Sequence, residues 1–383
     1  MTSKILFVSK DASWQRYRNE VLIELTKRFD CEVDIITQCK IKPDIKSTDK
    51  LRYIKSMNLL KNIAGLSFFP KTYYYILKEK PFAVLALPNS SNITELTLAI
   101  FCKFTSSKLV YWTHGYDHCQ RPKSGIKKYL EKIRVAVINW CVSQGDSIIT
   151  FSNSGKTYLT SKGIDDAKIF VAPNTLNTEK LLASYDTVKP SSIDAFKAQY
   201  DLCNKTVYLF SGRLRAGKRL EHFIQALSMS SKKSQSALVV VGDGDMSGEW
   251  QKLSREYELN IHFLGEIFDE EKLAIIFKSA DWFIMPGYVG LAIVHAFSAG
   301  LPLLTENISF HSPEINYLEE NINGVMFNEF AINEWVTFID GDGENEATKL
   351  RMSTEALRTV RNEASIQNQL TAMALALDIS PNV

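Results

Sequence analysis

The chain has 383 residues, of which 45% are hydrophobic and 23% are charged, a composition that excludes a disordered or fibrous protein. Its length predicts two domains. No stretch reaches the ~18 consecutive apolar residues of a membrane-spanning helix, and the six cysteines lack the paired spacing of a metal or redox site. We therefore expect a reduced, cytoplasmic setting and no bound metal.

Charge is distributed unevenly along the chain. Residues 1–180 contain 28 lysines and arginines against 16 acidic residues, whereas the remainder contains 17 against 27. A basic first half suits nucleic acid, anionic lipid or a phosphate-bearing acceptor. Aromatic residues and lysines interleave in FFPKTYYYILKEK, but no nucleic-acid motif surrounds them, so a nucleic-acid partner is not expected.

Short strand-like runs alternate with helical patterns from the first residues onward. In the first part of the chain, strands are predicted at residues 4–9, 32–37, 83–88, 108–114, 147–152 and 169–173. The segment KKYLEKIRVAVINWCV, between the fourth and fifth of these strands, is the clearest helical pattern. Such alternation predicts a parallel sheet with helices on both faces.

The helix predicted near residues 125–142 has an apolar stripe made by Ile126, Leu130, Ile133 and Val137. Four basic residues lie elsewhere around it: Lys127, Lys128, Lys132 and Arg134. Two interpretations fit this pattern. The helix either lies on an anionic membrane surface, or it turns the stripe to the core and leaves its basic side in water.

A serine- and proline-containing stretch at residues 181–196 is interpreted as the connection between two domains. After it, strands are predicted at residues 206–212, 237–244, 261–266, 282–286, 301–305 and 324–327. We therefore predict two doubly wound, Rossmann-like α/β domains, at residues 1–185 and 195–358, followed by a helical region at about 360–383.

Ligands of doubly wound sheets bind at the carboxyl ends of the strands, so the residues that follow the second-domain strands are candidates. In LFSGRLRAGKRLEHF, Arg213 and Lys218 lie between a strand end and a helix start. Basic side chains beside helix amides favour an anion, although a solvated basic loop has the same composition. The sequence lacks the G-K-S/T of a P-loop.

The next strand ends in VVVGDGD, where a tight turn is the expected role of the glycines. A complete G-x-G-x-x-G is absent, which disfavours a dinucleotide site.

The segment GYVGLAIVHAFSAGLP predicts a loop and a short helix that ends at Gly300. The amides of Gly290 and Leu291 open this helix and can donate hydrogen bonds to phosphate oxygens. His295 lies one turn later, either facing the ligand or packed in the core.

Together these segments resemble the nucleotide-sugar domain of retaining GT-B glycosyltransferases of glycosyltransferase family 4. The resemblance covers residues 207–327 most clearly, through SGRLRAGKRLEHFIQAL, LVVVGDGD and SPEINYLEENINGVMF. It implies the GT-B fold, with two Rossmann-like domains facing a central cleft and the last helical region packed back on the first domain. It also implies a UDP- or GDP-linked sugar as co-substrate, contacts from Glu314 to this donor, and no cofactor or metal.

The sequence departs from that family at one motif. The family usually carries two glutamates eight positions apart, and Gly287 and His295 occupy these positions here. The first glutamate ordinarily meets the donor sugar and the second the ribose. A neutral His295 can hydrogen-bond a ribose hydroxyl, so we interpret the motif as a variant.

The resemblance assigns the acceptor side to the first domain. His114, at the end of a predicted strand, is placed near the reacting sugar, although a surface histidine is the alternative. Tyr17 and Arg18 open the first helix, where relatives place acceptor contacts, and Arg18 is suited to an acceptor phosphate.

The expected activity is retaining transfer of a sugar from a nucleotide-diphosphate sugar to a glycan or glycolipid. On the resemblance alone, the setting is bacterial capsule, O-antigen or lipopolysaccharide synthesis, in the cytoplasm or peripherally on the inner face of the plasma membrane. Two alternatives stay open: a nucleotide-sugar epimerase of the same fold, and a non-catalytic GT-B partner subunit.

Overall fold

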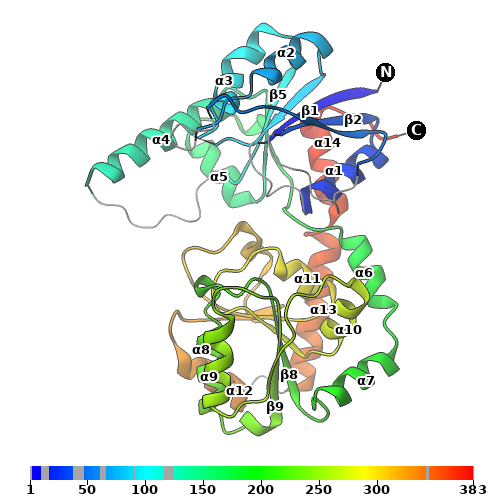
Figure 1. The fold of residues 1–383 in the computed structure, drawn as a ribbon, viewed down its shortest axis with the longest axis vertical. Helices are drawn as coiled ribbons and strands as arrows, with labels where there is room; N and C mark the ends of the chain where they lie inside the picture. The colour runs from blue at the N-terminus through cyan, green and yellow to red at the C-terminus, as the bar shows by residue number, and fades with distance from the viewer. Residues whose placement is uncertain are drawn as a thin grey trace. The chain divides into compact units, whose positions relative to one another are not determined.

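The computed structural model describes residues 2–9, 17–37, 47–60, 66–89, 91–115, 125–341 and 345–382 (Figure 1). Contacts divide the chain into two compact units. Unit 1 comprises residues 1–174 and 366–383, and unit 2 comprises residues 175–365. The first domain was predicted to end at residue 185, but the chain enters unit 2 at residue 175. The second domain was predicted to end at residue 358, but unit 2 continues to residue 365.

The reason for the earlier boundary is that the predicted connection is helical. It contains α6 (Thr178–Asp186) and α7 (Pro190–Gln199). Tyr185 of α6 and Phe196 of α7 are buried in the core of unit 2. Proline and serine at the start of α7 mark the first turn of a helix here, where the missing proline N–H costs no hydrogen bond.

Unit 1 contains a seven-stranded sheet whose neighbouring strands all pair in parallel, in the order β3-β2-β1-β4-β5-β6-β7. The strands are β1 (Ser3–Ser9), β2 (Cys31–Thr37), β3 (Leu51–Lys55), β4 (Ala83–Ala86), β5 (Lys108–Thr113), β6 (Ser147–Thr150) and β7 (Ile169–Val171). Strand β3 was not predicted. It lies at the sheet edge, and of its five residues only Leu51 is buried, so its sequence lacks a clear apolar pattern.

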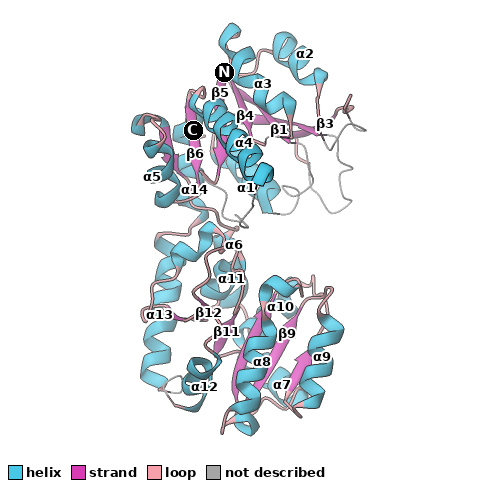
Figure 2. Cartoon of the chain, turned by 90° about the vertical axis from the view of Figure 1, so that its left-hand side faces the viewer, coloured by secondary structure: helices cyan, strands magenta, loops and turns pink. Residues whose placement is uncertain are grey.

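Helices cover both faces of this sheet (Figure 2). They are α1 (Tyr17–Arg28), α2 (Pro70–Glu79), α3 (Ile93–Phe101), α4 (Gly125–Ser143), α5 (Asn153–Ser161) and α14 (Ile366–Leu377). α1 and α14 share one core cluster, and α2 to α5 contribute to the cluster on the other face. None of the helices in the described ranges combines the length and apolar content needed to cross a bilayer.

Unit 2 contains a six-stranded sheet, also parallel, in the order β10-β9-β8-β11-β12-β13. The strands are β8 (Thr206–Ser211), β9 (Ser236–Val241), β10 (Ile261–Phe263), β11 (Trp282–Ile284), β12 (Leu303–Glu306) and β13 (Gly324–Phe327). The order reverses between β8 and β11. In doubly wound sheets, such a reversal of strand order is where ligands bind, at the carboxyl ends of the two strands.

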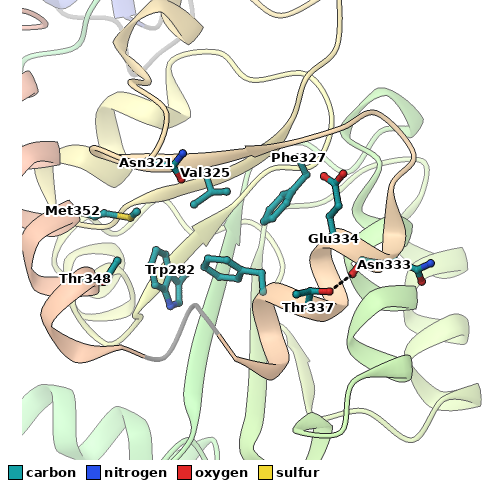
Figure 3. A pocket seen from close by; sticks show the side chains of 10 residues that line it. Trp282, Asn321, Val325, Phe327, Asn333, Glu334, Thr337, Thr348 and Met352 are labelled. Atoms are coloured by element: carbon teal, nitrogen blue, oxygen red, sulfur yellow. Dashed lines mark hydrogen bonds between the residues drawn. The ribbon is translucent and has the colours of Figure 1, made fainter.

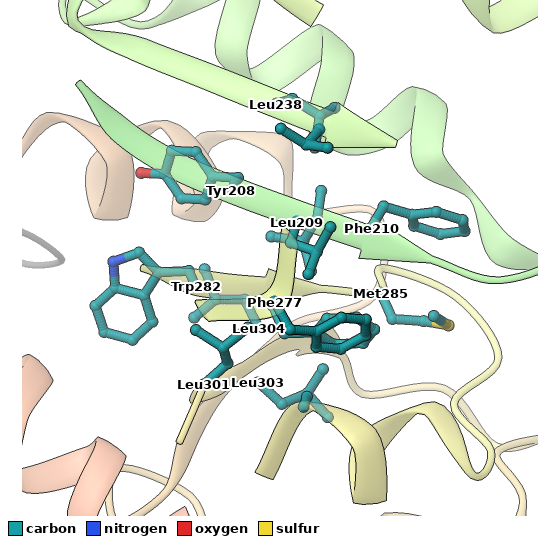
Figure 4. Packing of buried hydrophobic residues seen from close by; sticks show 14 of the residues in the cluster. Tyr208, Leu209, Phe210, Leu238, Phe277, Trp282, Met285, Leu301, Leu303 and Leu304 are labelled. Carbon is teal, nitrogen blue, oxygen red and sulfur yellow. The ribbon is translucent and has the colours of Figure 1, made fainter. Parts of the chain in front are cut away.

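The helices of unit 2 form two layers around this sheet. They are α6, α7, α8 (Leu220–Met229), α9 (Ser247–Glu256), α10 (Glu270–Lys278), α11 (Ala292–Ser298), α12 (Ile332–Asp340) and α13 (Glu346–Asn362). α8 packs with α9 and α12, whereas α10 and α11 pack with α6. Figure 4 shows the core around Leu209 of β8 and Trp282 of β11, where large side chains exclude water. Two parallel α/β domains confirm the predicted fold class.

Helix α14 offers a matched test of the core of unit 1. Leu370 is fully buried against this core, whereas Leu375 on the same helix is 63% exposed. Leu370→Ala is expected to lower the free energy of unfolding by about 2–5 kcal/mol, because it leaves a cavity. Leu375→Ala should change it by less than about 0.5 kcal/mol. Urea unfolding measures both, and equal losses would show that α14 is not part of this core.

Candidate functional site

The loops that follow β8 and β11 are joined by two backbone hydrogen bonds. The N–H of Gly287 donates to the carbonyl of Lys218 at 2.9 Å, and the N–H of Tyr288 donates to the carbonyl of Gly217 at 2.8 Å. These two loops flank the reversal of strand order in unit 2. The structure thus brings Lys218 and the glycine loop together at the crevice where doubly wound sheets bind ligands.

Gly287 has no room for a side chain. A Cβ at this position would lie 2.2 Å from the carbonyl oxygen of Gly217 and 2.8 Å from the carbonyl carbon of Lys218. Both are backbone atoms, so the clash is not relieved by a side-chain rotation. A glycine at position 287 is therefore required by this close approach of the two loops.

The Lys218 side chain spans the gap between the two loops. Its Nζ donates to the carbonyl of Tyr288 at 2.6 Å, lies 3.0 Å from Sδ of Met285 and sits 5.1 Å from the centre of the Tyr288 ring. Burial lowers the pKa of Lys218 to about 8, and the nearby Arg215 acts in the same direction, whereas Glu314 opposes it. An anion bound here would relieve this unfavourable burial of positive charge.

Arg213 is exposed on the same loop, and no hydrogen bond or ion pair within the described ranges engages its side chain. The loop is held by backbone contacts to the turn after β9. The N–H of Leu214 donates to the carbonyl of Asp243 at 2.9 Å. Gly242 lies at φ +124°, and a Cβ there would lie 2.0 Å from the carbonyl oxygen of Gly212. The glycine in VGDG thus allows two loops to touch rather than binding a phosphate.

Helix α11 is shorter than predicted, at seven residues, with Leu291 as its N-cap. Among the described residues, no protein acceptor takes the N–H of Gly290 or of Leu291, so both amides are available to a ligand. The helix ends as predicted. Gly300 adopts φ +78°, and its N–H and that of Leu301 cap the last turn.

His295 lies on α11 but faces α6 and α10. Its Nδ1 is 3.4 Å from the hydroxyl of Tyr185, and its ring centre is 5.8 Å from that of Phe277. Burial lowers the pKa of His295 to about 4, so the imidazole is neutral at physiological pH. Its hydrogen bond and ring contacts in the described part of the chain are with these two residues, which is the packing expected of a core histidine.

A second set of contacts supports the glycine loop from β12. The N–H of Val289 donates to Nδ1 of His311 at 3.1 Å, and Nε2 of His311 donates to the carbonyl of Glu306 at 2.8 Å. This pair of bonds defines a neutral histidine with its proton on Nε2. Burial lowers the pKa of His311, which favours the same neutral form.

Glu306, at the end of β12, is fully buried and bridges two elements. Its carboxylate pairs with Arg219 at 3.1 Å and with Nδ1 of His222 at 2.5 Å. Arg219, at φ +53°, also pairs with Glu329 at 2.7 Å. Sequence reasoning missed this cluster, although the position of a glutamate at a strand end in a doubly wound domain is a signal that points to it.

Glu314 is buried just after this region, on the 3-10 turn Pro313–Tyr317. It accepts a hydrogen bond from the hydroxyl of Ser312. Its charge acts on Lys218 and partly opposes the lowering of that lysine's pKa by burial and by Arg215, so the structure brings the two predicted residues into the same region.

In unit 1 the structure brings Arg18 and His114 to one aromatic pair. The Arg18 guanidinium is buried, 4.8 Å from the ring centre of Trp112 and 5.9 Å from that of Phe151. His114 is exposed, and its ring centre is 4.5 Å from that of Phe151. Tyr17 begins α1, and its side chain lies outside the described residues. Arg18 and His114 therefore both lie near the carboxyl ends of β5 and β6.

Figure 3 shows a pocket of about 430 Å³ elsewhere in unit 2. It is lined by residues of β11, β13, α12 and α13, among them Trp282, Phe327 and Met352. Its one charged lining residue, Glu334, already accepts hydrogen bonds from Asn328. The pocket contains none of the predicted site residues and lacks positive charge for a phosphate. In the ranges described, no cluster of three potential metal ligands occurs.

The two glycines of the loop after β11 provide a matched pair of substitutions. Gly287→Ala is expected to lower the free energy of unfolding by about 1–3 kcal/mol, because backbone atoms must move to admit the new methyl group. Gly290→Ala should have a much smaller effect, since the nearest atom to its Cβ lies at an ordinary 3.5 Å. Urea unfolding separates the two. A Gly287→Ala protein as stable as Gly290→Ala would refute the close approach.

The pKa of His295 predicts a pH dependence of stability. The unfolded chain protonates this histidine near pH 6.5, whereas the folded protein does so only near pH 4. The stability that the folded protein gains by keeping His295 neutral is therefore complete above pH 6.5 and is lost as the pH falls towards 4. Between pH 7.5 and 5, the unfolding free energy of the wild type should fall by about 2 kcal/mol more than that of His295→Gln. Parallel pH curves for the two proteins would contradict this.

Parts of the chain match known proteins in sequence. Residues 192–357, which include the loops after β8 and β11, match the family model described as Glycosyl transferases group 1. An uncharacterized glycosyltransferase of Methanocaldococcus jannaschii, MJ1607, is 26% identical over 129 residues. That match spans about a third of the length of each protein, 32% in both cases.

Solved structures resemble the chain over nearly its full length. HepE of Anabaena, solved in complex with UDP, aligns with a TM-score of 0.72 at 16% identity, over 98% of this chain and 99% of that chain. The lipopolysaccharide outer core galactosyltransferase WaaB aligns with a TM-score of 0.66 at 15% identity, over 97% and 99%. At these identities the likeness is one of fold, and it confirms the predicted GT-B class. Residues 192–357 of unit 2 thus match the family model Glycosyl transferases group 1, within a chain whose fold is GT-B.

Proposed function

We propose that this protein transfers a sugar, with retention, from a nucleotide-diphosphate sugar to a hydroxyl of a glycan or lipid-linked acceptor. The observation that carries the proposal is the placement of Lys218. It is a partly buried lysine held by the loops on either side of the strand-order reversal, inside the region that matches the glycosyl transferases group 1 model. A diphosphate is the ligand whose charge suits that position.

The donor site is assembled from the groups around this lysine. Lys218 and Arg213 take the diphosphate as charged donors, and the amides of Gly290 and Leu291 add neutral ones. Glu314 acts on the same region through its charge on Lys218 and is proposed to orient the donor. His295 is assigned to the ribose, with its packing against Tyr185 as the competing role.

The chemistry required of these groups is stabilisation of a leaving group. In the transfer, the bond between the anomeric carbon and the diphosphate oxygen breaks, a bond to the acceptor oxygen forms, and the proton of the acceptor hydroxyl passes to the departing diphosphate. Negative charge grows on the departing diphosphate, where Lys218 and Arg213 are placed to stabilise it. No cofactor or metal is included in this proposal, because the positive charge comes from side chains.

The nucleotide is proposed to be UDP or GDP, with UDP the first to test. The structural neighbour HepE was solved with UDP and with UDP-glucose, which supports a uridine nucleotide without defining it for this chain. The sugar is left open, because Gly287 carries no side chain where the family's first glutamate meets the donor sugar.

The acceptor side is assigned to unit 1. Arg18 is proposed to hold an acceptor phosphate, with Tyr17 beside it on α1, and His114 is proposed to approach the reacting sugar. The fold likeness to a lipopolysaccharide galactosyltransferase supports a role in bacterial surface polysaccharide synthesis. The protein would then work in the cytoplasm or at the inner face of the plasma membrane.

One observation favours a second candidate, a non-catalytic partner subunit. Both glutamates of the usual motif are missing, and position 287 has no space for one. Incubating the purified protein with UDP-glucose and GDP-mannose, with and without lipid-linked acceptors, separates the two. Release of UDP or GDP that requires Lys218 supports an enzyme. Tight nucleotide binding without turnover supports the subunit, and interconversion of sugars on the nucleotide indicates an epimerase.

Lys218→Ala should weaken UDP binding by about 10- to 150-fold, the cost of one charge-assisted hydrogen bond. Lys252→Ala, whose lysine side chain is 73% exposed on α9, is the matched control and should bind UDP like the wild type. Isothermal calorimetry measures both. Unchanged affinity in Lys218→Ala would remove the diphosphate site from this loop.

The pKa of Lys218 adds an independent test on the unmodified protein. Because this pKa is about 8, the lysine is largely protonated at pH 7 and largely neutral at pH 9. UDP affinity of the wild type should therefore fall by about tenfold between pH 7 and pH 9. The affinity of Lys218→Ala should stay nearly constant over the same range.

A further inference from the structure

Helix α4 turns an apolar stripe away from the core of unit 1. Five large apolar or aromatic side chains on it are between 40% and 65% exposed: Tyr129, Leu130, Ile133, Val137 and Trp140. The spacing of Leu130, Ile133, Val137 and Trp140, three or four residues apart, places them on one helical face. The interpretation in which this stripe faces the core is therefore wrong.

The core-facing side of α4 is supplied by other residues. Cys141 and Val142, near its carboxyl end, are buried with the neighbouring strands and α3. Cys141 Sγ lies 3.7 Å from the carbonyl oxygen of Leu96 on α3. Figure 1 shows the amino-terminal half of α4 projecting past the sheet, so the stripe continues beyond the part of the helix that the core holds.

Exposed basic residues lie on the rest of α4. Lys132 lies about 60° around the helix from Tyr129, near an edge of the stripe, and Lys128 lies farther round, on the side opposite Leu130. Arg134, by contrast, is partly buried and paired with Glu131. The sequence around the helix is also basic, with 14 lysines and arginines against four acidic residues over residues 51–134. An anionic surface is therefore the complementary one.

The arrangement of residues around the stripe matches an interfacial helix. At about 100° per residue, Tyr129 and Trp140 lie along one edge of the stripe, and the aliphatic Leu130, Ile133 and Val137 make up the rest of it. Aromatic side chains with a polar group favour the boundary between headgroups and acyl chains, whereas aliphatic ones favour the acyl region. A helix with apolar residues on one side and lysines beside them lies in the membrane interface.

Further exposed apolar side chains adjoin the carboxyl end of α4. Lys103 donates a hydrogen bond to Gln144, which joins the turn after α3 to the residue that follows α4. Phe104, on that turn, is the most exposed large apolar side chain in the described ranges, at 83%. The surface next to Trp140 thus combines an exposed ring with a lysine, as the stripe itself does.

We propose that the outward face of α4, defined by Tyr129, Leu130, Ile133, Val137 and Trp140 and flanked by Lys132, docks on an anionic lipid surface. In this arrangement the helix lies parallel to the bilayer, with the apolar stripe toward the acyl chains and the lysines at the phosphates. The affinity comes from apolar burial together with attraction of the lysines to anionic headgroups.

A second copy of the chain fits this face less well. The stripe covers about 11 residues, or roughly 16 Å of helix, whereas a standard interface buries about 800 Å² on each partner. A two-fold contact through the stripe would also bring the lysines of both copies near one another. Anionic headgroups neutralise these lysines, which is why lipid is the assigned partner.

This inference stands apart from the proposed transfer reaction. All of its residues are in unit 1, and the assay below contains no nucleotide. The full-length protein is mixed with vesicles of phosphatidylcholine, or of phosphatidylcholine with phosphatidylglycerol, and the bound fraction is measured by flotation. The wild type should float with the anionic vesicles at low salt, and less so as salt screens its lysines.

Three variants separate the contributions of apolar burial and of lysine charge to vesicle binding. Leu130→Ser/Ile133→Ser/Val137→Ser should reduce the vesicle partition coefficient by about tenfold or more, because three apolar side chains no longer enter the bilayer. Lys128→Gln/Lys132→Gln should reduce it by about fivefold for each lysine, on anionic vesicles only. The matched control is Phe268→Ser/Leu350→Ser, since these unit 2 residues are 74% and 69% exposed, and it should float like the wild type.

The outcomes that overturn the inference are specific. Failure of the wild type to float at low salt would exclude membrane binding by α4. Flotation of the stripe variant to the same extent as the wild type would exclude it as well. Sedimentation velocity adds the third case, in which a dimeric wild type becomes monomeric in the stripe variant without any vesicle binding. Circular dichroism and urea unfolding of the stripe variant show that it is folded, and loss of flotation with a wild-type unfolding transition supports the inference.

Discussion

The contact on which the unit 2 site depends is the backbone pairing between residues 217–218 and residues 287–288. Two amides of one loop meet two carbonyls of the other, at 2.9 and 2.8 Å. This pairing forces the loops so close together that Gly287 cannot bear a Cβ, and it places the Lys218 side chain against the Tyr288 carbonyl. The position of the Lys218 side chain and the glycine at position 287 are therefore consequences of the same constraint.

The burial of Lys218 and the hydrogen bonds that hold its neighbouring loops explain why this arrangement is suited to an anion. Lys218 is kept in a low-dielectric position that lowers its pKa, so it gains from any negative ligand. Behind it, neutral His311 joins the glycine loop to β12, and fully buried Glu306 joins β12 to Arg219 at the start of α8. These bonds hold the loops in position before a ligand arrives, which reduces the ordering that binding requires.

Unit 1 has a buried arginine at its strand ends and an exposed apolar stripe on another helix. Arg18 is buried beneath Trp112 and Phe151 at the strand ends, whereas the apolar stripe of α4 is turned outward. A protein that acts only on soluble partners gains nothing by exposing five large apolar side chains along one helix. The exposed stripe and a lipid-linked acceptor are consistent with each other, although each rests on different residues.

The sequence by itself determined the order of strands and helices, the two parallel sheets and the helix stop at Gly300, because periodicity and local conformational preference act within a few residues. It also predicted that Lys218 lies in the loop after a strand end, the place where doubly wound sheets carry ligands. Only the tertiary structure decided which unit α6 and α7 join, that edge strand β3 exists, and that the α4 stripe faces outward. It alone explained Gly287, because a clash between loops 70 residues apart has no local signature. Amphipathic periodicity shows that a helix has two faces, and only its packing partners determine which face is buried.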